Sequence, residues 1–547
     1  MTSLQTDYDY IIVGAGSSGC VLAERLTADG QSSVLLVEAG GRNSSELVNM
    51  PRAFMKMWGK PRYFWHFPVK PQKGRPDNET WVYGRGLGGS SSTNGTWYLR
   101  GMAADYDAWH AMGLEEWSWS EISRCYRSLE SYRYEHADPS RGKDGPLQIT
   151  ESLYRSPVIE AIVKAGGEFG LPVLADLNTP QTDGIGYTQS TVDRRGRRAS
   201  SYRAFLKRAM RRPNLTVVTD TLVEKVIIKG KQATAVRCRR NGKLIDIQAR
   251  TDIILSAGVL QSPKLLQLSG IGPADVLERA GIELILDNPH VGRNLAEHAM
   301  FSISFRLKNN AGVNKEFSGW RLWKNVLHYY LSRRGQMAFT SVEVTALIAM
   351  DAPKSWPDVQ IGVAPFSMRS SEEMKADPGR GMLEDKPGIT LNGFYLRPKS
   401  RGSVAIQSAD IAEPILVDAN WWGDPEDVKT TTKMLRLMRR FASRPALSEY
   451  VGEELSPGAA VQSDEEIARA LEWLVSPGLH GTGTCRMGEK ENSVVDGRLR
   501  VHGISKLRVV DCSAMPTAIS GNTNGPAMVF GARAAELILE DRDGKTA

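Results

Sequence analysis

Cysteine is scarce in this chain of 547 residues, which contains only five. Cys20, Cys125, Cys238, Cys485 and Cys512 are odd in number, far apart and without a CxxC pair. Such spacing indicates neither a disulfide framework nor a zinc site. We therefore expect buried free thiols and no bound metal.

Long apolar runs, internal repeats and low-complexity tracts are also missing. No run reaches eighteen apolar residues, and residues 1–7 contain neither the basic region nor the apolar region of a secretory signal. Without a repeat, a solenoid is excluded. We expect a cytoplasmic protein with no transmembrane segment.

Charge of one sign does not dominate, because 69 basic residues face 62 acidic ones, for a net charge of +7. Basic clusters at 194–198 and 207–212 could attract an anionic membrane surface or an acidic partner. They lack interleaved aromatic residues, and no nucleic-acid module is present. We interpret them as solvated faces and expect no nucleic-acid partner; peripheral membrane contact and oligomeric state stay open.

The most informative pattern that is present is a GxGxxG turn at Gly14, Gly16 and Gly19. It follows an apolar strand-like run over 8–13 and precedes a helix-like stretch over 20–26. Its glycines permit a tight turn, backbone approach to a pyrophosphate and close helix–strand contact. A second apolar strand ends in Glu38, nineteen residues after Gly19, where a carboxylate binds ribose hydroxyls. The candidate cofactor-binding residues here are Gly14, Gly16, Ser17, Ser18, Gly19, Glu38 and Ala39.

Strand and helix patterns elsewhere predict a mixed α/β (α+β) fold with two domains. Apolar strand–turn–helix patterns occur near both ends of the chain, so we expect a Rossmann-like cofactor domain that is discontinuous in sequence. Alternating strands and amphipathic helices between them predict a substrate domain built on an antiparallel sheet flanked by helices. The predicted cofactor domain comprises 1–155, 200–310 and 460–547, and the predicted substrate domain comprises 156–199 and 311–459.

A glycine-rich stretch over 84–101 holds six glycines in eighteen residues and also contains Trp97, Tyr98 and Leu99. So many glycines suit backbone wrapped against a flat ligand, whereas a surface loop would not need large apolar residues that favour burial. Together with the N-terminal turn, this stretch resembles a signature of the glucose-methanol-choline (GMC) family of FAD oxidoreductases.

The resemblance extends over nearly the whole chain. Further matches lie at 258–272, at 291–295 with His298, at 396–402 and at 483–488. Val259 departs from the small residue usual at its position. Thr93 departs as well, because family members that tether FAD covalently can place histidine there. The resemblance therefore implies FAD, held noncovalently.

The resemblance also implies residues for cofactor and catalysis. The backbone of 94–96 would pack near the flavin ring, and Val223 would lie beside the adenine. The cofactor-binding set that it adds is Arg85, Gly88, Gly89, Ser90, Asn94, Gly95, Thr96, Val223, Ala257, Asp511, Cys512, Asn522 and Pro526. Pro526 suits the first turn of the last helix, whose N-terminus would stabilise the reduced flavin.

His480 stands in a loop, 476–486, among residues that cannot extend a helix. The resemblance assigns His480 as the catalytic base and Asn524 as its partner, with Asn522 as the nearby alternative. Imidazole, with an ordinary pKa of about 6.5, is a serviceable proton acceptor for the oxidation of a CH–OH group. His298 and His502 are interpreted as structural.

The substrate pocket is the least determined part of the site. Glu343 resembles an acidic position at its wall, although an exposed strand carboxylate explains it equally well. Trp65, Phe394 and Leu479 are candidate lining residues, although aromatic residues are more often in the core. The sequence predicts an oxidoreductase for primary or activated alcohols, with O2 or a quinone as electron acceptor. A lyase that resembles hydroxynitrile lyase, on the same fold, is the alternative.

Overall fold

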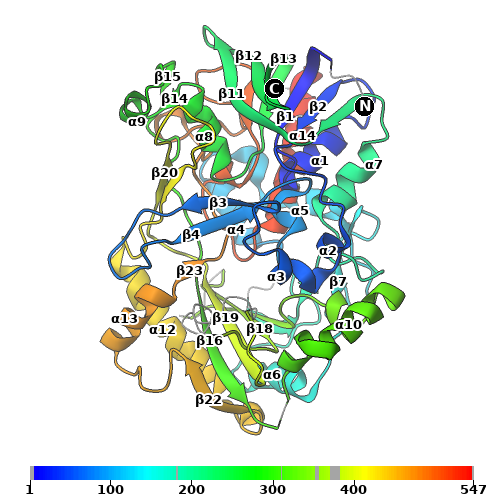
Figure 1. The fold of residues 1–547 in the computed structure, drawn as a ribbon, viewed down its shortest axis with the longest axis vertical. Helices are drawn as coiled ribbons and strands as arrows, with labels where there is room; N and C mark the ends of the chain where they lie inside the picture. The colour runs from blue at the N-terminus through cyan, green and yellow to red at the C-terminus, as the bar shows by residue number, and fades with distance from the viewer. Residues whose placement is uncertain (1–4, 180–182, 310, 351–355, 370–381, 545–547) are drawn as a thin grey trace.

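The chain in this computed structural model is described over residues 5–179, 183–309, 311–350, 356–369 and 382–544. Two seven-stranded sheets form its two ends, and the short hairpin of β3 (Phe64–Pro68) and β4 (Thr80–Gly84) lies between them (Figure 1). The α/β (α+β) fold class is thereby confirmed.

The first sheet has the strand order β10-β2-β1-β13-β12-β11, with β24 paired to β13. Its parallel centre, in which β1 pairs with β2 and β13, is apolar on both faces and almost fully buried, as expected for strands covered by helices. Its strands are β1 (Asp7–Val13), β2 (Val34–Val37), β10 (Leu215–Val218), β11 (Thr221–Lys229), β12 (Gln232–Arg240), β13 (Lys243–Leu255) and β24 (Leu507–Val509).

Helices from opposite ends of the chain pack together on this sheet. α1 (Ser17–Leu26) follows β1, and α14 (Asn524–Arg542) closes the chain; both contribute buried residues to one core with β1, β2 and β13. Ser18 Oγ donates to the Ala527 carbonyl over 2.8 Å, which ties the two helices. The predicted return of the C-terminal segment to the N-terminal turn is therefore observed.

The second sheet is antiparallel, with the order β22-β16-β19-β18-β17-β8 and with β23 paired to β16. Side chains alternate across it: Leu391 and Tyr395 of β19 face the helices, whereas Phe394 faces the interior between the sheets. Its strands are β8 (Gly184–Tyr187), β16 (Ala299–Leu307), β17 (Val344–Ile348), β18 (Val359–Ala364), β19 (Gly388–Tyr395), β22 (Val451–Ser456) and β23 (Ser476–Pro477).

Three helices cover the outer face of the second sheet, namely α6 (Pro157–Glu168), α12 (Pro425–Ala442) and α13 (Asp464–Leu474). α10 (Gly319–Ser332) lies apart from them, at the lower right of Figure 1. β16 and β23 pair within this sheet, although the predicted boundaries assign 299–307 and 476–477 to the cofactor domain. The division into domains stays a prediction.

Candidate active site

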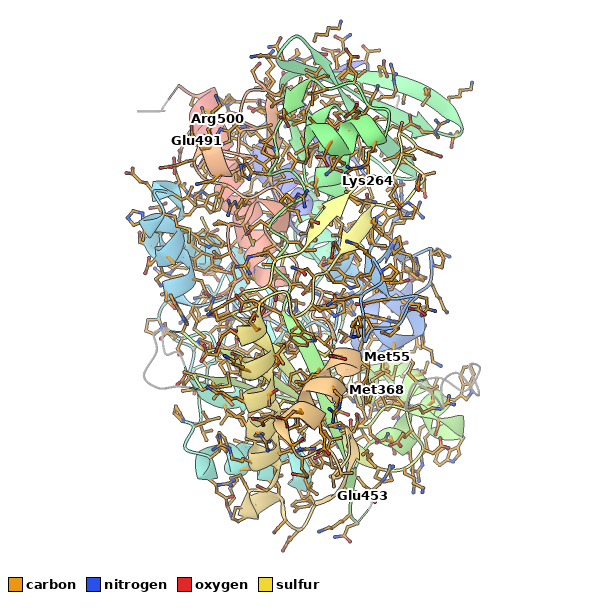
Figure 2. The ribbon with its side chains drawn as sticks, turned by 90° about the vertical axis from the view of Figure 1, so that its left-hand side faces the viewer. Met55, Lys264, Met368, Glu453, Glu491 and Arg500 are labelled. Atoms are coloured by element: carbon orange, nitrogen blue, oxygen red, sulfur yellow. The ribbon has the colours of Figure 1, made fainter. Side chains whose placement is uncertain are left out.

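A cavity of about 510 Å³ runs between the two sheets, within the range of natural ligand sites. It begins at the turn after β1, passes the end of β2 and the glycine-rich stretch, and reaches Phe394 of β19 and the loop of His480. Met55 and Met368, which are labelled in Figure 2, also line it.

The glycine turn after β1 is packed too tightly for other residues. A Cβ on Gly14, whose φ is +101°, would lie 2.5 Å from the Ser256 carbonyl oxygen, and one on Gly19 would lie 2.0 Å from that of Gly14. Gly14, Gly16, Ser17 and Ser18 line the cavity, whereas Gly19 faces the strand. Gly14 thus permits the tight turn and Gly19 permits the close contact between helix and strand, as the sequence predicts.

Glu38 follows β2 and is buried at the same end of the cavity. Its Oε2 accepts from the Ala15 amide over 2.9 Å, and its Oε1 accepts from the amides of Gly40 and Gly86 over 2.8 and 3.0 Å. A carboxylate has about four acceptor sites, so one remains for a ligand hydroxyl. Ala39 lines the cavity beside it.

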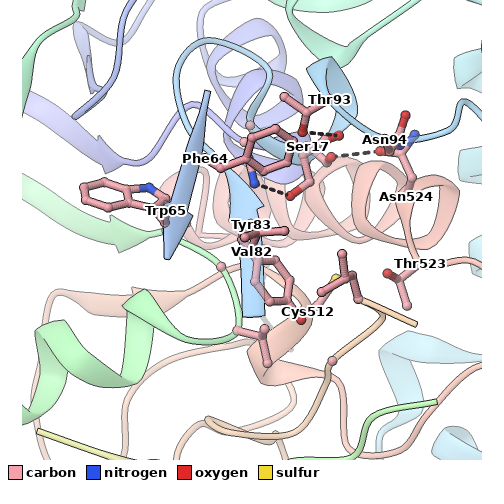
Figure 3. Close-up of a pocket in the computed structure, with 18 of the residues that line it drawn as sticks. Ser17, Phe64, Trp65, Val82, Tyr83, Thr93, Asn94, Cys512, Thr523 and Asn524 are labelled. Carbon is pink, nitrogen blue, oxygen red and sulfur yellow. Dashed lines mark hydrogen bonds between the residues drawn. The ribbon is translucent and has the colours of Figure 1, made fainter. Parts of the chain in front are cut away.

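The glycine-rich stretch lies directly on the first turn. A Cβ on Gly89 would come within 2.9 Å of the Gly16 Cα, and Gly88 has a left-handed φ of +88°. Gly89, Ser90, Asn94 and Gly95 line the cavity. Thr93 does so too, and its hydroxyl donates to the Ser90 carbonyl (Figure 3).

Some of the other predicted cofactor residues line the cavity, and the rest lie behind its wall. Val223, Ala257, Asp511, Cys512 and Asn522 line the cavity. Arg85, Gly88, Thr96 and Pro526 do not line it: Arg85 stacks its guanidinium 4.5 Å from the Trp65 ring centroid, and Thr96 is fully buried with a φ of +66°.

Arg198 is a functional candidate that the sequence reasoning missed. It is fully buried, and its Nη1 donates to Asn94 Oδ1 over 2.7 Å while its Nε donates to the Val48 carbonyl. No described carboxylate forms an ion pair with it, and burial lowers its pKa to about 9, so it is still cationic at neutral pH. The buried guanidinium of Arg198 thus fixes the side chain of Asn94, which lines the cavity. No local pattern distinguishes it from the neighbouring arginines.

His480 lies at the opposite end of the cavity and is 8% exposed. Its Nε2 is 2.9 Å from Asn522 Nδ2, and its Nδ1 is 3.1 Å from His298 Nδ1. Its backbone amide donates to Glu297 Oε1 over 2.8 Å. Burial lowers the pKa of His480 to about 3, so its ring is neutral at pH 7, and burial raises the pKa of Glu297 to about 8.

The neighbours of Asn522 indicate which nitrogen of His480 is basic. Gln360 Nε2 donates to Asn522 Oδ1 over 2.9 Å, which turns the Asn522 amide NH2 toward His480. His480 Nε2 is then an acceptor, and the proton of the neutral ring lies on Nδ1, facing His298. Gln360, the one polar side chain in the apolar strand β18, was a signal that the sequence reasoning did not use.

Asn524 occupies a different place from the one predicted. Its Oδ1 accepts from Ser17 Oγ over 2.9 Å (Figure 3), and the hydrogen bond to His480 comes from Asn522 instead. The reason is the course of the chain: Asn524 is the first residue of α14, which packs on α1, while Asn522 precedes the helix in the turn toward β18. Asn524 Nδ2 is buried in the cavity wall and has no hydrogen-bond partner among the described residues, so it can donate to a ligand.

Glu343 requires a second correction, because it neither lines the cavity nor is exposed. It is fully buried, forms an ion pair with Arg52 and accepts a hydrogen bond from Ser152. Burial raises the pKa of Glu343, and the charge of Arg52 opposes that rise. Trp65, Phe394 and Leu479 line the cavity, and their contact with substrate stays a prediction.

The glycine turn and Glu38 lie at one end of the cavity, its nucleotide end, and His480 lies at the other, its base end. This arrangement is typical of oxidoreductases that use a dinucleotide cofactor. The comparisons give the family. Residues 8–300 and 398–531 match the two family models described as GMC oxidoreductase. The chain therefore belongs to the GMC oxidoreductase family, and the predicted enzyme class, an oxidoreductase of CH–OH donors, is confirmed.

Relatives match along nearly their whole length. An oxygen-dependent choline dehydrogenase of Photobacterium profundum is 37% identical over 98% of this chain and 94% of its own. An alcohol dehydrogenase [acceptor] of Pseudomonas putida is 34% identical over 98% and 96%. Among solved structures, a formate oxidase has a TM-score of 0.90 at 25% identity over all of both chains. An FAD-dependent oxidoreductase from Chaetomium thermophilum has a TM-score of 0.86 at 26% identity over 99% and 100%.

Proposed function

We propose that this enzyme binds FAD noncovalently and oxidises a primary or activated alcohol to a carbonyl compound. The nucleotide end of the cavity supports the cofactor assignment: the Gly14–Gly19 turn, the remaining acceptor site of Glu38 and the free Asn524 Nδ2 are suited to a pyrophosphate, a ribose and a polar ring edge. A described structural relative carries FAD in its name.

The N-terminus of α14 supports an electron-rich ligand. No side chain caps this helix, and Thr523, Asn524 and Ala527 of its first turn line the cavity. Its first N–H groups and its dipole therefore favour negative charge at this place. When bound, FAD supplies the acceptor for the hydride that leaves the alcohol carbon.

The base end carries the proton step. His480 Nε2 takes the hydroxyl proton while the Asn522 amide donates to the same oxygen, so a proton and a hydride leave the CH–OH group together. The single observation that supports this assignment best is the bond between His480 Nε2 and Asn522, whose orientation Gln360 holds.

A neutral, apolar alcohol suits the cavity better than a cationic one. Glu38 and Asp511 are the only acidic residues among the described lining residues, and Asp511 accepts from Ser262 Oγ and the Gly258 amide. Around Phe394 the wall consists largely of apolar side chains, namely Trp97, Met300, Val342, Ala364 and Phe366. A quaternary ammonium group would have aromatic faces there but no carboxylate.

The test is anaerobic mixing of holoenzyme with a panel of alcohols that includes benzyl alcohol, 1-octanol and choline. Bleaching of the flavin band by the neutral alcohols is expected, with choline at least tenfold slower. Carbonyl release without bleaching would instead support the lyase alternative, although none of the relatives named above is a lyase. Peroxide formation in air, measured against reduction of a quinone or dye, distinguishes the electron acceptors.

His480→Ala is expected to slow flavin reduction by about a hundredfold or more, as the loss of a general base does. Reduction at the wild-type rate would refute the assignment. Noncovalent binding has its own measurement, because acid precipitation should leave yellow flavin in the supernatant. Flavin in the pellet would mean a covalent tether, for which Thr93 offers no ring nitrogen.

A further inference from the structure

Helix α10 exposes an apolar face to solvent. Trp320, Trp323, Leu327 and Leu331 are 68%, 75%, 59% and 79% exposed, and Tyr330 is 49% exposed. Their spacing of three or four residues aligns them along one side of the helix. Single exposed apolar residues are ordinary, but a continuous stripe of five marks an interaction surface.

Folding does not account for this stripe, because α10 buries a different face. Leu322, Val326 and Tyr329 pack with Met50, Ala53 and Met337 in a small core of their own. The helix thus has one apolar side for the protein and another with no partner among the described residues. Among the described residues, no helix combines the length and the apolar character that crossing a membrane requires.

Basic residues accompany the stripe. Residues 319–334 contain Arg321, Lys324, Arg333 and Arg334 and no acidic residue. Arg333 pairs with Glu46 and Arg321 lies 3.7 Å from Glu316, but Lys324 and Arg334 form no ion pair with any described residue. Lys324 Nζ lies 5.8 Å from the Trp320 ring centroid, so a free cation accompanies the aromatic residues.

We propose that the exposed face of α10, defined by Trp320, Trp323, Leu327, Tyr330 and Leu331, docks on an anionic phospholipid surface. Tryptophan, tyrosine and leucine insert at the boundary between headgroups and acyl chains, while lysine and arginine bind anionic headgroups. A second copy of this chain would bring like charges together at the same place, which is unfavourable. Charge and composition thus both favour lipid.

The N-terminal end of α10 is close to the cavity wall. Phe317, at the end of η5 (Asn314–Phe317) and directly before α10, contacts Phe366 of the cavity with ring centroids 6.0 Å apart. Trp58 and Met368, both cavity residues, are 43% and 39% exposed. An enzyme docked through α10 would therefore admit an apolar alcohol or quinone from the bilayer. This consequence rests on the proposed function, whereas the docking itself does not.

The test is vesicle flotation of holoenzyme with phosphatidylcholine alone and with a 3:1 mixture of phosphatidylcholine and phosphatidylglycerol. We expect binding to the anionic vesicles that weakens as salt is added. The combined variant Trp320→Ser, Trp323→Ser, Leu331→Ser should lower the partition coefficient at least tenfold. The charge variant Lys324→Glu, Arg334→Glu should lower binding to the anionic vesicles and leave binding to phosphatidylcholine vesicles unchanged. Trp473→Ser, which changes a 56% exposed tryptophan of α13, is the matched control and should bind as wild type.

Each variant should keep its flavin content and its rate with a water-soluble alcohol, because none of these residues lines the cavity. Equal vesicle binding by the triple variant, or no binding by wild type at low salt, would overturn the proposal. So would a dimer in solution that the triple variant converts to monomers, since α10 would then be an interface between copies. A failure of the alcohol assay alone would leave the flotation result standing.

Discussion

The two asparagines before and at the start of α14 have separable roles at the scale of single residues. Asn522 donates to His480, whereas Asn524 bonds Ser17 beside the glycine turn. We expect Asn522→Ala to slow anaerobic flavin reduction by about ten- to a hundredfold, since it removes a donor to the reacting oxygen. Asn524→Ala should weaken FAD retention with a smaller effect on that rate.

Stopped-flow reduction and flavin content after gel filtration measure the two effects. The reverse pattern, with Asn524→Ala the slower variant in reduction at full flavin content, would restore the partner that the sequence suggested.

The pH dependence of kcat/KM is set by one residue, His480. A base with a pKa of about 3 stays unprotonated through the acid range, whereas an ordinary histidine would lose about tenfold in basic form at pH 5.5. We expect kcat/KM to change by less than about twofold between pH 8 and 5.5. A fall with a midpoint near 6.5 would contradict the buried, neutral state of His480.

Thermal unfolding at each pH is the necessary control. His480 binds fewer protons folded than unfolded, so the stability that it contributes is present above pH 6.5 and declines as the pH falls toward 3.

At the scale of elements, the contact between α1 and α14 decides how the nucleotide end is built. Gly531 lies inside α14, where glycine costs about 0.5–1 kcal/mol relative to alanine, yet a Cβ there would lie 2.8 Å from the Ser18 carbonyl oxygen. We expect Gly531→Ala to destabilise the protein by about 1–3 kcal/mol through overpacking and to lower flavin retention.

Gly167→Ala in α6 is the matched control, because an added Cβ there would meet no atom within 4 Å. It should be neutral or stabilising. Equal melting temperatures for the two variants would show that the helices can separate without cost.

At the scale of the whole molecule, Arg52 and Glu343 join segments that the sequence assigns to different domains. Both are buried, and burial drives the pKa of each toward its neutral form: lower for Arg52 and higher for Glu343. Removing one partner leaves an uncompensated buried charge, so Glu343→Gln should cost about 3–5 kcal/mol. Thermal melts of the holoenzyme measure it.

The double variant Arg52→Met, Glu343→Leu should recover most of that loss. Asp246→Asn, which breaks the exposed pair with Arg237, should cost at most about 1 kcal/mol. A Glu343→Gln melt within about 1 °C of wild type would mean that this ion pair does not hold the two segments together.

Local patterns were sufficient for much of the fold. Strand β1, the glycine turn and α1 could be predicted because their residues are neighbours in sequence. Gly14 and Gly19 are required there because a Cβ at either position would clash with backbone. The helices α6, α10 and α12 lie in the segments 156–199 and 311–459, for which periodicity predicted amphipathic helices. The exposed stripe of α10 was not recognised, because periodicity shows that a helix has an apolar face but not what covers it.

By itself, the sequence determined the glycine turn between β1 and α1 and the loop that presents His480, because turn chemistry is local. Only the tertiary structure decided that Asn522 rather than Asn524 faces His480, and that Glu343 is neutralised by Arg52 instead of lining the cavity. These outcomes depend on contacts between residues 42 and 291 positions apart, where packing of whole elements, not spacing, sets which side chains meet.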